Sequence, residues 1–180
     1  CLIFLYRLLF ILYAEGRSLL PVEPHRKYYK DFSLARLVGP LKGFAEFNSP
    51  NRTRLYEDIC ELCRLINGTD KAKNREYSVP RYNGGLFDSS KHPELDLWRI
   101  SDNKLADVLR GLMFAKPDRR ERELPLETVD YADLRVQQLG SIYEGLLEHH
   151  FTHRDDGTLQ LTTDKAERKA TGTYYTPDYI

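Results

Sequence analysis

Several residue types that mark particular protein classes are scarce in this sequence. It has three cysteines, one methionine and one tryptophan among 180 residues. An odd and small number of cysteines, with no secretory segment, excludes a disulfide-stapled extracellular scaffold and indicates a reducing compartment. The chain also lacks a starting methionine, since its first residue is Cys1. We therefore expect it to be a piece of a longer protein.

Net charge and long hydrophobic runs are absent as well. Lys and Arg together number 27, as do Asp and Glu, so the chain lacks the strong positive field of a stand-alone nucleic-acid binder. Any contact with DNA would have to be local. The apolar stretch LIFLYRLLFILYA, residues 2–14, is too short and too interrupted by Arg7 to span a bilayer. It predicts a buried helix and no membrane partner.

What the sequence does contain is helical periodicity, in a chain long enough to fold around one core. The first apolar stretch ends at Gly16, a residue that commonly terminates helices. Ser49 and Pro50 are typical of a helix start, and Asn67-Gly68 of a helix end. Between them, the positions predicted to face the core are Leu55, Ile59, Leu62, Cys63 and Ile66.

Two further amphipathic helices are predicted, one beginning near Ser101 or Asp102 and one near Asp133. Their inward faces are expected to comprise Leu105, Val108, Leu109 and Leu112 in the first helix, and Leu139, Ile142, Tyr143, Leu146 and Leu147 in the second. Residues 67–85 and 116–128 are predicted to be loops. TLQLTT, residues 158–163, alternates like one short strand. The predicted fold is mainly α, a bundle-like helical domain with minor peripheral β structure.

Two groups of side chains resemble metal sites. Cys60 and Cys63 are spaced like half of a zinc site, but no second pair accompanies them, so two thiols on the helix stripe are the favoured interpretation. His149, His150 and His153 could present imidazoles at helical spacing. No further ligand completes a metal shell, and a frayed, solvated helix end is favoured instead.

Nuclease and nucleotide-hydrolase motifs are also weak. Pro117-Asp118 and Glu167-Arg168-Lys169 imitate the Pro-Asp…Glu-x-Lys skeleton of a magnesium-dependent nuclease. Both pieces lie in charged segments without strands, so ordinary surface charge is favoured. The sequence has no phosphate-binding loop of the G-x-x-x-x-G-K-[ST] type, and Gly84-Gly85 alone predicts a turn.

Gly140 and Gly145 lie inside the last predicted helix. Glycine there costs about 1 kcal/mol relative to alanine. Close approach of another helix or backbone would offset that cost, and a tolerated defect is the alternative.

Four segments occur here in the order in which one protein family has them: LLFILYAEGRSLLP (8–21), RYNGGLF (81–87), LGSIYEGLLE (139–148) and RKATGTYYTPDYI (168–180). Over essentially its whole length, the chain resembles the helical region just ahead of the catalytic domain in large adenine-N6 DNA methyltransferases. These enzymes belong to restriction-modification and phage-defence systems and include single-chain type IIG enzymes. TGTYYTP resembles motif X, which opens the methyltransferase domain in this permuted class.

The resemblance implies a helical linker domain over residues 1–167 and the truncated start of a methyltransferase domain over residues 168–180. It implies S-adenosylmethionine as the cofactor of the longer protein, double-stranded DNA as a partner, and a prokaryotic cytoplasm as the location. The chain's own methyltransferase domain, and a nuclease domain in some relatives, would be further partners. The cofactor-lining positions that it implies are Tyr174, Tyr175, Thr176 and Pro177.

The chain departs from the family in lacking a glycine-rich cofactor loop and an Asn-Pro-Pro-aromatic motif. We therefore expect these 180 residues alone to hold no catalytic residue and to be inactive. Two non-catalytic roles stay open, a structural coupler and a DNA-binding module. The basic groups for DNA binding would be Lys71, Lys73, Arg75, Arg81, Arg119, Arg120 and Arg122, although the acidic residues among them favour a solvated surface.

Overall fold

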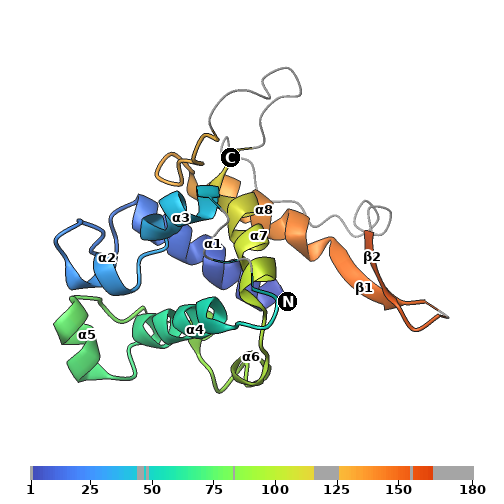
Figure 1. Ribbon diagram of the computed structural model, residues 1–180, viewed down its shortest axis with the longest axis horizontal. Helices are drawn as coiled ribbons and strands as arrows, with labels where there is room; N and C mark the ends of the chain where they lie inside the picture. The colour runs from blue at the N-terminus through green and yellow to red at the C-terminus, as the bar shows by residue number, and fades with distance from the viewer. Residues whose placement is uncertain are drawn as a thin grey trace, which may run out of the picture. The chain divides into compact units, whose positions relative to one another are not determined.

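A computed structural model describes residues 2–43, 47, 49–82, 84–115, 126–154 and 156–163 (Figure 1). Over these residues the chain is mainly helical, with one two-stranded antiparallel sheet. This confirms the predicted mainly α fold with minor β structure. The chain divides into two compact units, essentially residues 3–134 and 135–180, and each is described by itself.

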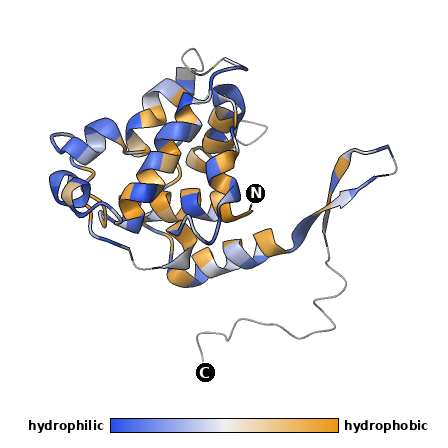
Figure 2. Ribbon diagram, turned by 90° about the horizontal axis from the view of Figure 1, so that it is seen from below, coloured by the Kyte–Doolittle hydropathy of each residue, from blue (hydrophilic) through white to orange (hydrophobic). Residues whose placement is uncertain are grey.

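The first unit contains all the helices up to the seventh. Its elements are α1 (Leu2–Gly16), α2 (Lys27–Asp31), the 3-10 helix η1 (Ala35–Leu37), α3 (Val38–Gly43), α4 (Arg54–Asn67), α5 (Lys71–Tyr77), the 3-10 helix η3 (Gly85–Phe87), α6 (Glu94–Leu97) and α7 (Asp102–Met113). These helices carry hydrophobic and hydrophilic residues in alternating bands (Figure 2). The pattern is that of amphipathic helices sharing one core.

Helix α1 is apolar nearly all round and is buried along most of its length, as predicted. Its buried apolar residues are Phe4, Tyr6, Leu8, Leu9, Ile11, Leu12 and Ala14. The helix ends at Gly16, where the chain comes against another segment. A Cβ added there would lie 2.9 Å from the Ala132 nitrogen and 3.1 Å from atoms of Tyr131. Only glycine fits this close backbone approach without displacement.

Helix α4 confirms the predicted stripe and corrects its start. All five predicted inward residues are buried, and Gly68 ends the helix in the left-handed conformation at φ 70°. The helix begins at Arg54, however, rather than at Ser49 and Pro50. The Asp102 Oδ1 atom accepts a hydrogen bond from the Leu55 backbone nitrogen at 2.8 Å. A carboxylate distant in sequence therefore caps α4, which no local signal could reveal.

The segment 67–85 is not a continuous loop, because residues 71–77 form helix α5. The Asp70 side chain accepts hydrogen bonds from the backbone nitrogens of Ala72 at 2.9 Å and Lys73 at 3.0 Å. This is the usual geometry of an N-cap. The sequence signal that the loop prediction missed was Asp70, which precedes Ala72 by two residues and Lys73 by three.

Helix α7 begins at Asp102, as predicted, with a slightly different buried face. Val108 is 44% exposed and Leu112 is only half-buried, contrary to the prediction. The buried residues are Asp102, Leu105, Ala106, Leu109 and Met113. Burial of the Asp102 carboxylate against α4 sets this face, and the 4-3-4 spacing of Asp102, Ala106, Leu109 and Met113 leaves Val108 outside it.

The second unit consists of α8 (Val136–Leu147), β1 (His149–His153) and β2 (Leu159–Thr163). The strand predicted at 158–163 is confirmed as β2. Its partner β1 was missed, because the histidines were assigned to a helix end. The two strands pair antiparallel, with Phe151 opposite Leu161 and His153 opposite Leu159. Gly157, at φ 77°, allows the turn between them.

The prediction that α8 buries one face is wrong for the described residues. None of its residues is buried, and Tyr143 and Leu147 are 48% and 42% exposed. The helix also begins at Val136, three residues later than predicted. No described atom lies within 4 Å of a Cβ added at Gly145. The expected close approach at that glycine is therefore not found within this part of the chain.

Candidate functional site

Two of the segments that carry the family resemblance pack directly on each other in the first unit. The Phe10 ring of α1 lies 5.2 Å from the Phe87 ring and 5.5 Å from the Tyr82 ring, centroid to centroid, in edge-to-face arrangements. The Tyr82 hydroxyl donates to the Leu19 carbonyl at 2.7 Å. Residues 8–21 and 81–87 thus form one packing unit built on aromatic contacts.

Arg7 stabilises the contact between residues 8–21 and 81–87 from within the core. Its side chain is 4% exposed, and its Nε donates to the Leu86 carbonyl at 2.7 Å. The guanidinium carbon lies 5.9 Å from the Phe87 ring centroid, over its face. A buried cation is tolerated where a carbonyl and an aromatic face replace part of its hydration. The charge that interrupts the apolar stretch is therefore a structural contact.

Glu15, at the other end of α1, organises the segment that follows α2. Its carboxylate is buried and accepts four hydrogen bonds. The donors are the Tyr28 hydroxyl at 2.8 Å, the Ser33 hydroxyl at 3.1 Å, and the backbone nitrogens of Leu34 at 2.9 Å and Ala35 at 2.8 Å. Burial raises the pKa of Glu15, and the hydrogen bonds oppose that shift. The carboxylate therefore fixes the start of η1.

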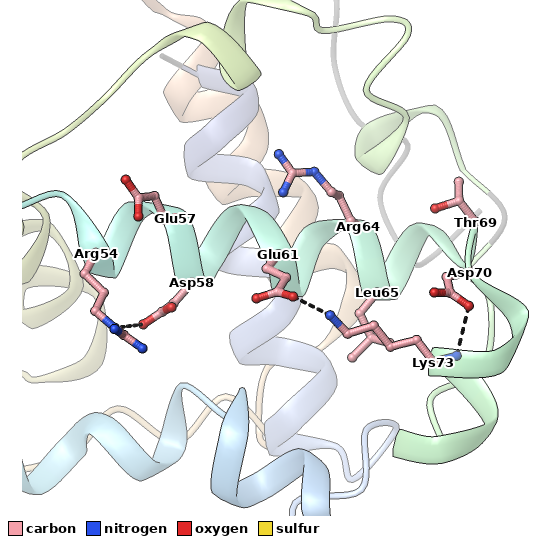
Figure 3. A pocket seen from close by; sticks show the side chains of 9 residues that line it. All are labelled: Arg54, Glu57, Asp58, Glu61, Arg64, Leu65, Thr69, Asp70 and Lys73. Carbon is pink, nitrogen blue, oxygen red and sulfur yellow. Dashed lines mark hydrogen bonds and ion pairs between the residues drawn. The ribbon is translucent and has the colours of Figure 1, made fainter.

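A groove of about 580 Å³ runs along α4 and α5 (Figure 3). Four of its charged residues form two ion pairs within it. Arg54 lies 3.8 Å from Asp58, Lys73 reaches from α5 to Glu61, and Asp70 caps α5. Arg64, on the same helix, lies 2.7 Å from Asp96. The full lining is Arg54, Glu57, Asp58, Glu61, Arg64, Leu65, Thr69, Asp70 and Lys73.

This groove is a poor site for phosphate or for general acid-base chemistry. Four acidic groups face three basic ones, so a polyanion would meet a slightly negative surface. Burial raises the pKa of Asp58 while Arg54 lowers it, and ion-paired surface groups of this kind perturb pKa values without a catalytic role. We interpret the groove as a network that holds α4 and α5 together.

The cysteines confirm the prediction of two thiols on the apolar stripe of α4. Both Cys60 and Cys63 are free and buried. Burial raises the pKa of Cys63 to about 12, despite the opposing charge of Arg7, so the reactive thiolate is suppressed at neutral pH. No group of three or more His, Cys, Asp or Glu within the described ranges could hold a metal ion. His149, His150 and His153 lie on β1 and not on a helix.

The basic groups proposed for DNA binding divide into three sets, of which one is Lys71 and Arg75, both exposed on α5. Lys73 pairs with Glu61, and Arg81 donates from Nε to the Asn67 carbonyl at 3.2 Å while its side chain covers Gly68. These two cations serve internal contacts. Arg119, Arg120 and Arg122 lie outside the described residues.

The predicted cofactor residues Tyr174, Tyr175, Thr176 and Pro177 also lie outside the described residues. So do the predicted domain boundary at 167/168 and the nuclease-like pieces around Asp118 and Glu167. Across the part of the chain that the structure describes, no helix has the length and apolarity needed to cross a bilayer.

Comparison with known proteins gives one distant relative. Over 176 residues, 97% of this chain, the sequence is 24% identical to a protein of Methanocaldococcus jannaschii named "Putative type II restriction enzyme and methyltransferase". The chain spans 13% of that relative's length. No family model and no solved structure matches the chain. The similarity supports a link to restriction-modification proteins, in agreement with the four segments noted in the sequence.

Proposed function

We propose that this chain is the helical linker region of a site-specific adenine-N6 DNA methyltransferase of a restriction-modification system. The observation that carries the proposal is the similarity over 97% of the chain to a relative named as both restriction enzyme and methyltransferase. The order of the four family segments supports it. The linker joins an upstream region to the catalytic domain and helps to shape the DNA channel.

The contacts of the first unit suit a coupling role. Arg7 and Glu15 each fix a segment distant in sequence through hydrogen bonds, and the Lys73–Glu61 ion pair joins α5 to α4 at the surface. Such hydrogen bonds and ion pairs between segments rigidify the unit. They favour the structural coupler over a module whose basic groups grip phosphate.

The enzyme assay uses the complete polypeptide with S-adenosylmethionine labelled in the methyl group and a DNA of mixed sequence. We expect label on the N6 atom of adenine at one recognition sequence. Digestion to nucleosides and chromatography identify the product. Label found only on cytosine, or no label on the DNA, would contradict the proposal.

The proposed cofactor positions are tested in the same polypeptide. Tyr175→Ala should weaken S-adenosylmethionine binding about ten-fold, which corresponds to about 1.4 kcal/mol of lost contact. Tyr29→Ala, which changes a half-buried tyrosine of α2, is the matched control. The 180-residue chain alone should show no micromolar binding by calorimetric titration, since most of the pocket lies elsewhere. Equal affinity of the two variants would remove Tyr175 from the site.

DNA contact by the linker itself has a separate test. If the chain is only a coupler, the 180 residues should bind a 30-base-pair duplex no better than a neutral control protein at 50 mM salt. Tight binding that weakens steeply with salt, and that is lost in the double variant Lys71→Ala and Arg75→Ala, would favour the DNA-binding module instead.

A further inference from the structure

The hairpin of the second unit carries three large apolar side chains on one face, each more than half exposed, with His153 opposite Leu159 on the same face. Phe151 on β1 lies opposite Leu161 on β2, and alternation along β2 places Leu159 on the same side. Phe151, Leu159 and Leu161 are 56%, 60% and 54% exposed. We call these three residues the hairpin face. Hydrophobic colouring is visible along both α8 and the hairpin in Figure 2.

This arrangement is incomplete as a folded unit. A two-stranded hairpin is only marginally stable in water, and it gains stability when a sheet face packs on another element. Helix α8 supplies no core either, because none of its residues is buried. Contiguous exposed apolar side chains of this kind mark interaction surfaces. The hairpin face is therefore suited to packing on another surface.

A second copy of the chain is a poor candidate for that cover. With about 200 Å² for a large apolar side chain, the exposed fractions of the hairpin face amount to roughly 340 Å² per copy. A stable interface between separate proteins buries about 800 Å² on each partner. A small face can nevertheless dock when its partner is tethered to it, because the effective concentration then reaches the millimolar range.

Few residues connect the hairpin to the segment that follows it in the chain. Strand β2 ends at Thr163, and the proposed methyltransferase domain begins at residue 168. Five residues, at no more than about 3.6 Å each, span at most about 18 Å. Whatever domain this segment opens must therefore begin close to the hairpin face.

We propose that the hairpin face docks on an apolar surface of the methyltransferase domain that begins at residue 168. The inference rests on the proposed function, which supplies that domain. The contact fixes the linker relative to the catalytic domain and removes the hairpin face from water.

Photocrosslinking in the complete polypeptide tests this docking. The photoreactive residue p-benzoylphenylalanine replaces Phe151 in one variant and Thr152, on the opposite face of the same strand, in the control. After irradiation, mass spectrometry should find crosslinks from position 151 to peptides that follow residue 180. The control should give at least ten-fold fewer. Crosslinks only to residues 3–134, crosslinks to a second copy, or equal yields at both positions would overturn the proposal.

Amide hydrogen exchange gives an independent measurement. Residues 149–163 should exchange at least ten-fold more slowly in the complete polypeptide than in the 180-residue chain, and the double variant Phe151→Ser and Leu161→Ser should abolish the difference. The matched control is Thr152→Ser with Gln160→Ser on the other face. Equal exchange in the two wild-type proteins would overturn the docking.

Methyl transfer by the unmodified polypeptide is measured in parallel. Transfer without added protection means that the docking alone is wrong. Protection and crosslinks without transfer support the docking contact and refute the proposed activity.

Discussion

Glu15 shows how a single carboxylate can specify a turn between two helices. Buried polar groups are stable only when hydrogen-bonded, and here four donors converge on the two oxygens from Tyr28, Ser33, Leu34 and Ala35. The Tyr28 hydroxyl has its pKa raised by burial and by the neighbouring Glu15 charge, so it remains a donor. The acid near the end of an apolar helix thus acts as an anchor for the next segment.

Replacing Glu15 by Gln should lower the free energy of unfolding by about 1–3 kcal/mol, because the amide nitrogen cannot accept the hydrogen bonds that the second oxygen receives. Glu23→Gln, which removes a carboxylate of an exposed pair with Arg26, should change it by less than about 0.5 kcal/mol. Urea denaturation followed by circular dichroism measures both variants. Equal stability of the two would refute the anchoring role.

The difference in stability between the wild type and Glu15→Gln should depend on pH. Burial raises the folded-state pKa of Glu15 above its ordinary value of 4.5. The contribution of Glu15 to the free energy of unfolding is therefore fully present below about pH 4.5. It is lost as the pH rises through the folded-state pKa. The stability advantage of the wild type over Glu15→Gln should shrink over that range. An advantage that grows with pH would contradict this assignment.

Gly16 offers a test of close packing at the end of α1. Gly16→Ala should lower the free energy of unfolding by about 1–3 kcal/mol, because its Cβ would meet the backbone at Ala132. Gly111→Ala, in α7 with no atom within 4 Å of the new Cβ, should raise stability by about 1 kcal/mol through helix propensity. Thermal unfolding measures both. A neutral effect at Gly16 would show that the backbone can separate.

Asp102, at the start of α7, caps the start of α4 and so joins the two helices. The Asp102 backbone nitrogen donates to the Arg52 carbonyl at 2.7 Å, and its Oδ2 lies 3.4 Å from the Arg52 Nε. With the bond from Leu55 to Oδ1, one residue at the start of α7 fixes the start of α4. Negative charge at a helix N-terminus is also favoured by the helix dipole.

Asp102→Ala should therefore destabilise both helices together, by about 2 kcal/mol, since it removes a cap and leaves the Leu55 amide buried without its partner. Asp107→Ala, an exposed residue of the same helix, is the matched control and should be nearly neutral. Hydrogen exchange of the amides at the start of α4 reports the cap directly. Loss of stability without faster exchange there would mean that Asp102 acts by another route.

The two compact units differ in how much apolar surface they bury. The first contains every buried core residue of the described chain, whereas α8 and the hairpin contain none. Local stability follows buried contacts. The chain is therefore expected to be a stable helical unit joined to a segment whose structure depends on a partner.

Native-state hydrogen exchange of the 180-residue chain should show this difference. The α4 amides should be protected to nearly the global free energy of unfolding, and those of α8 and the hairpin at least 100-fold less, which corresponds to about 2.7 kcal/mol. Low urea should remove the second unit before the first. Equal protection of the two would show that the second unit is stabilised within this chain.

Prediction from the sequence succeeded where local spacing decides the structure. The helices around residues 2–16, 55–66 and 102–113 follow from apolar periodicity, and Gly16 and Gly68 mark their ends because each has a backbone requirement. The loop prediction over 71–77 failed because a seven-residue helix carries too little periodicity to be seen, and only its Asp70 cap indicated it. The histidines of β1 were misassigned because a strand is defined by a partner that lies further along the chain.

The sequence by itself determined the fold class, the apolar stripe of α4 and the family likeness, since these depend on residue types at short spacings. The tertiary structure alone decided the roles of Arg7, Glu15 and Asp102, because each partner lies far away in sequence and a buried charge is stable only where those partners converge. It also decided that α8 and the hairpin leave none of their apolar residues fully buried. Amphipathic spacing shows which face can be buried, but a covering surface must be present to bury it.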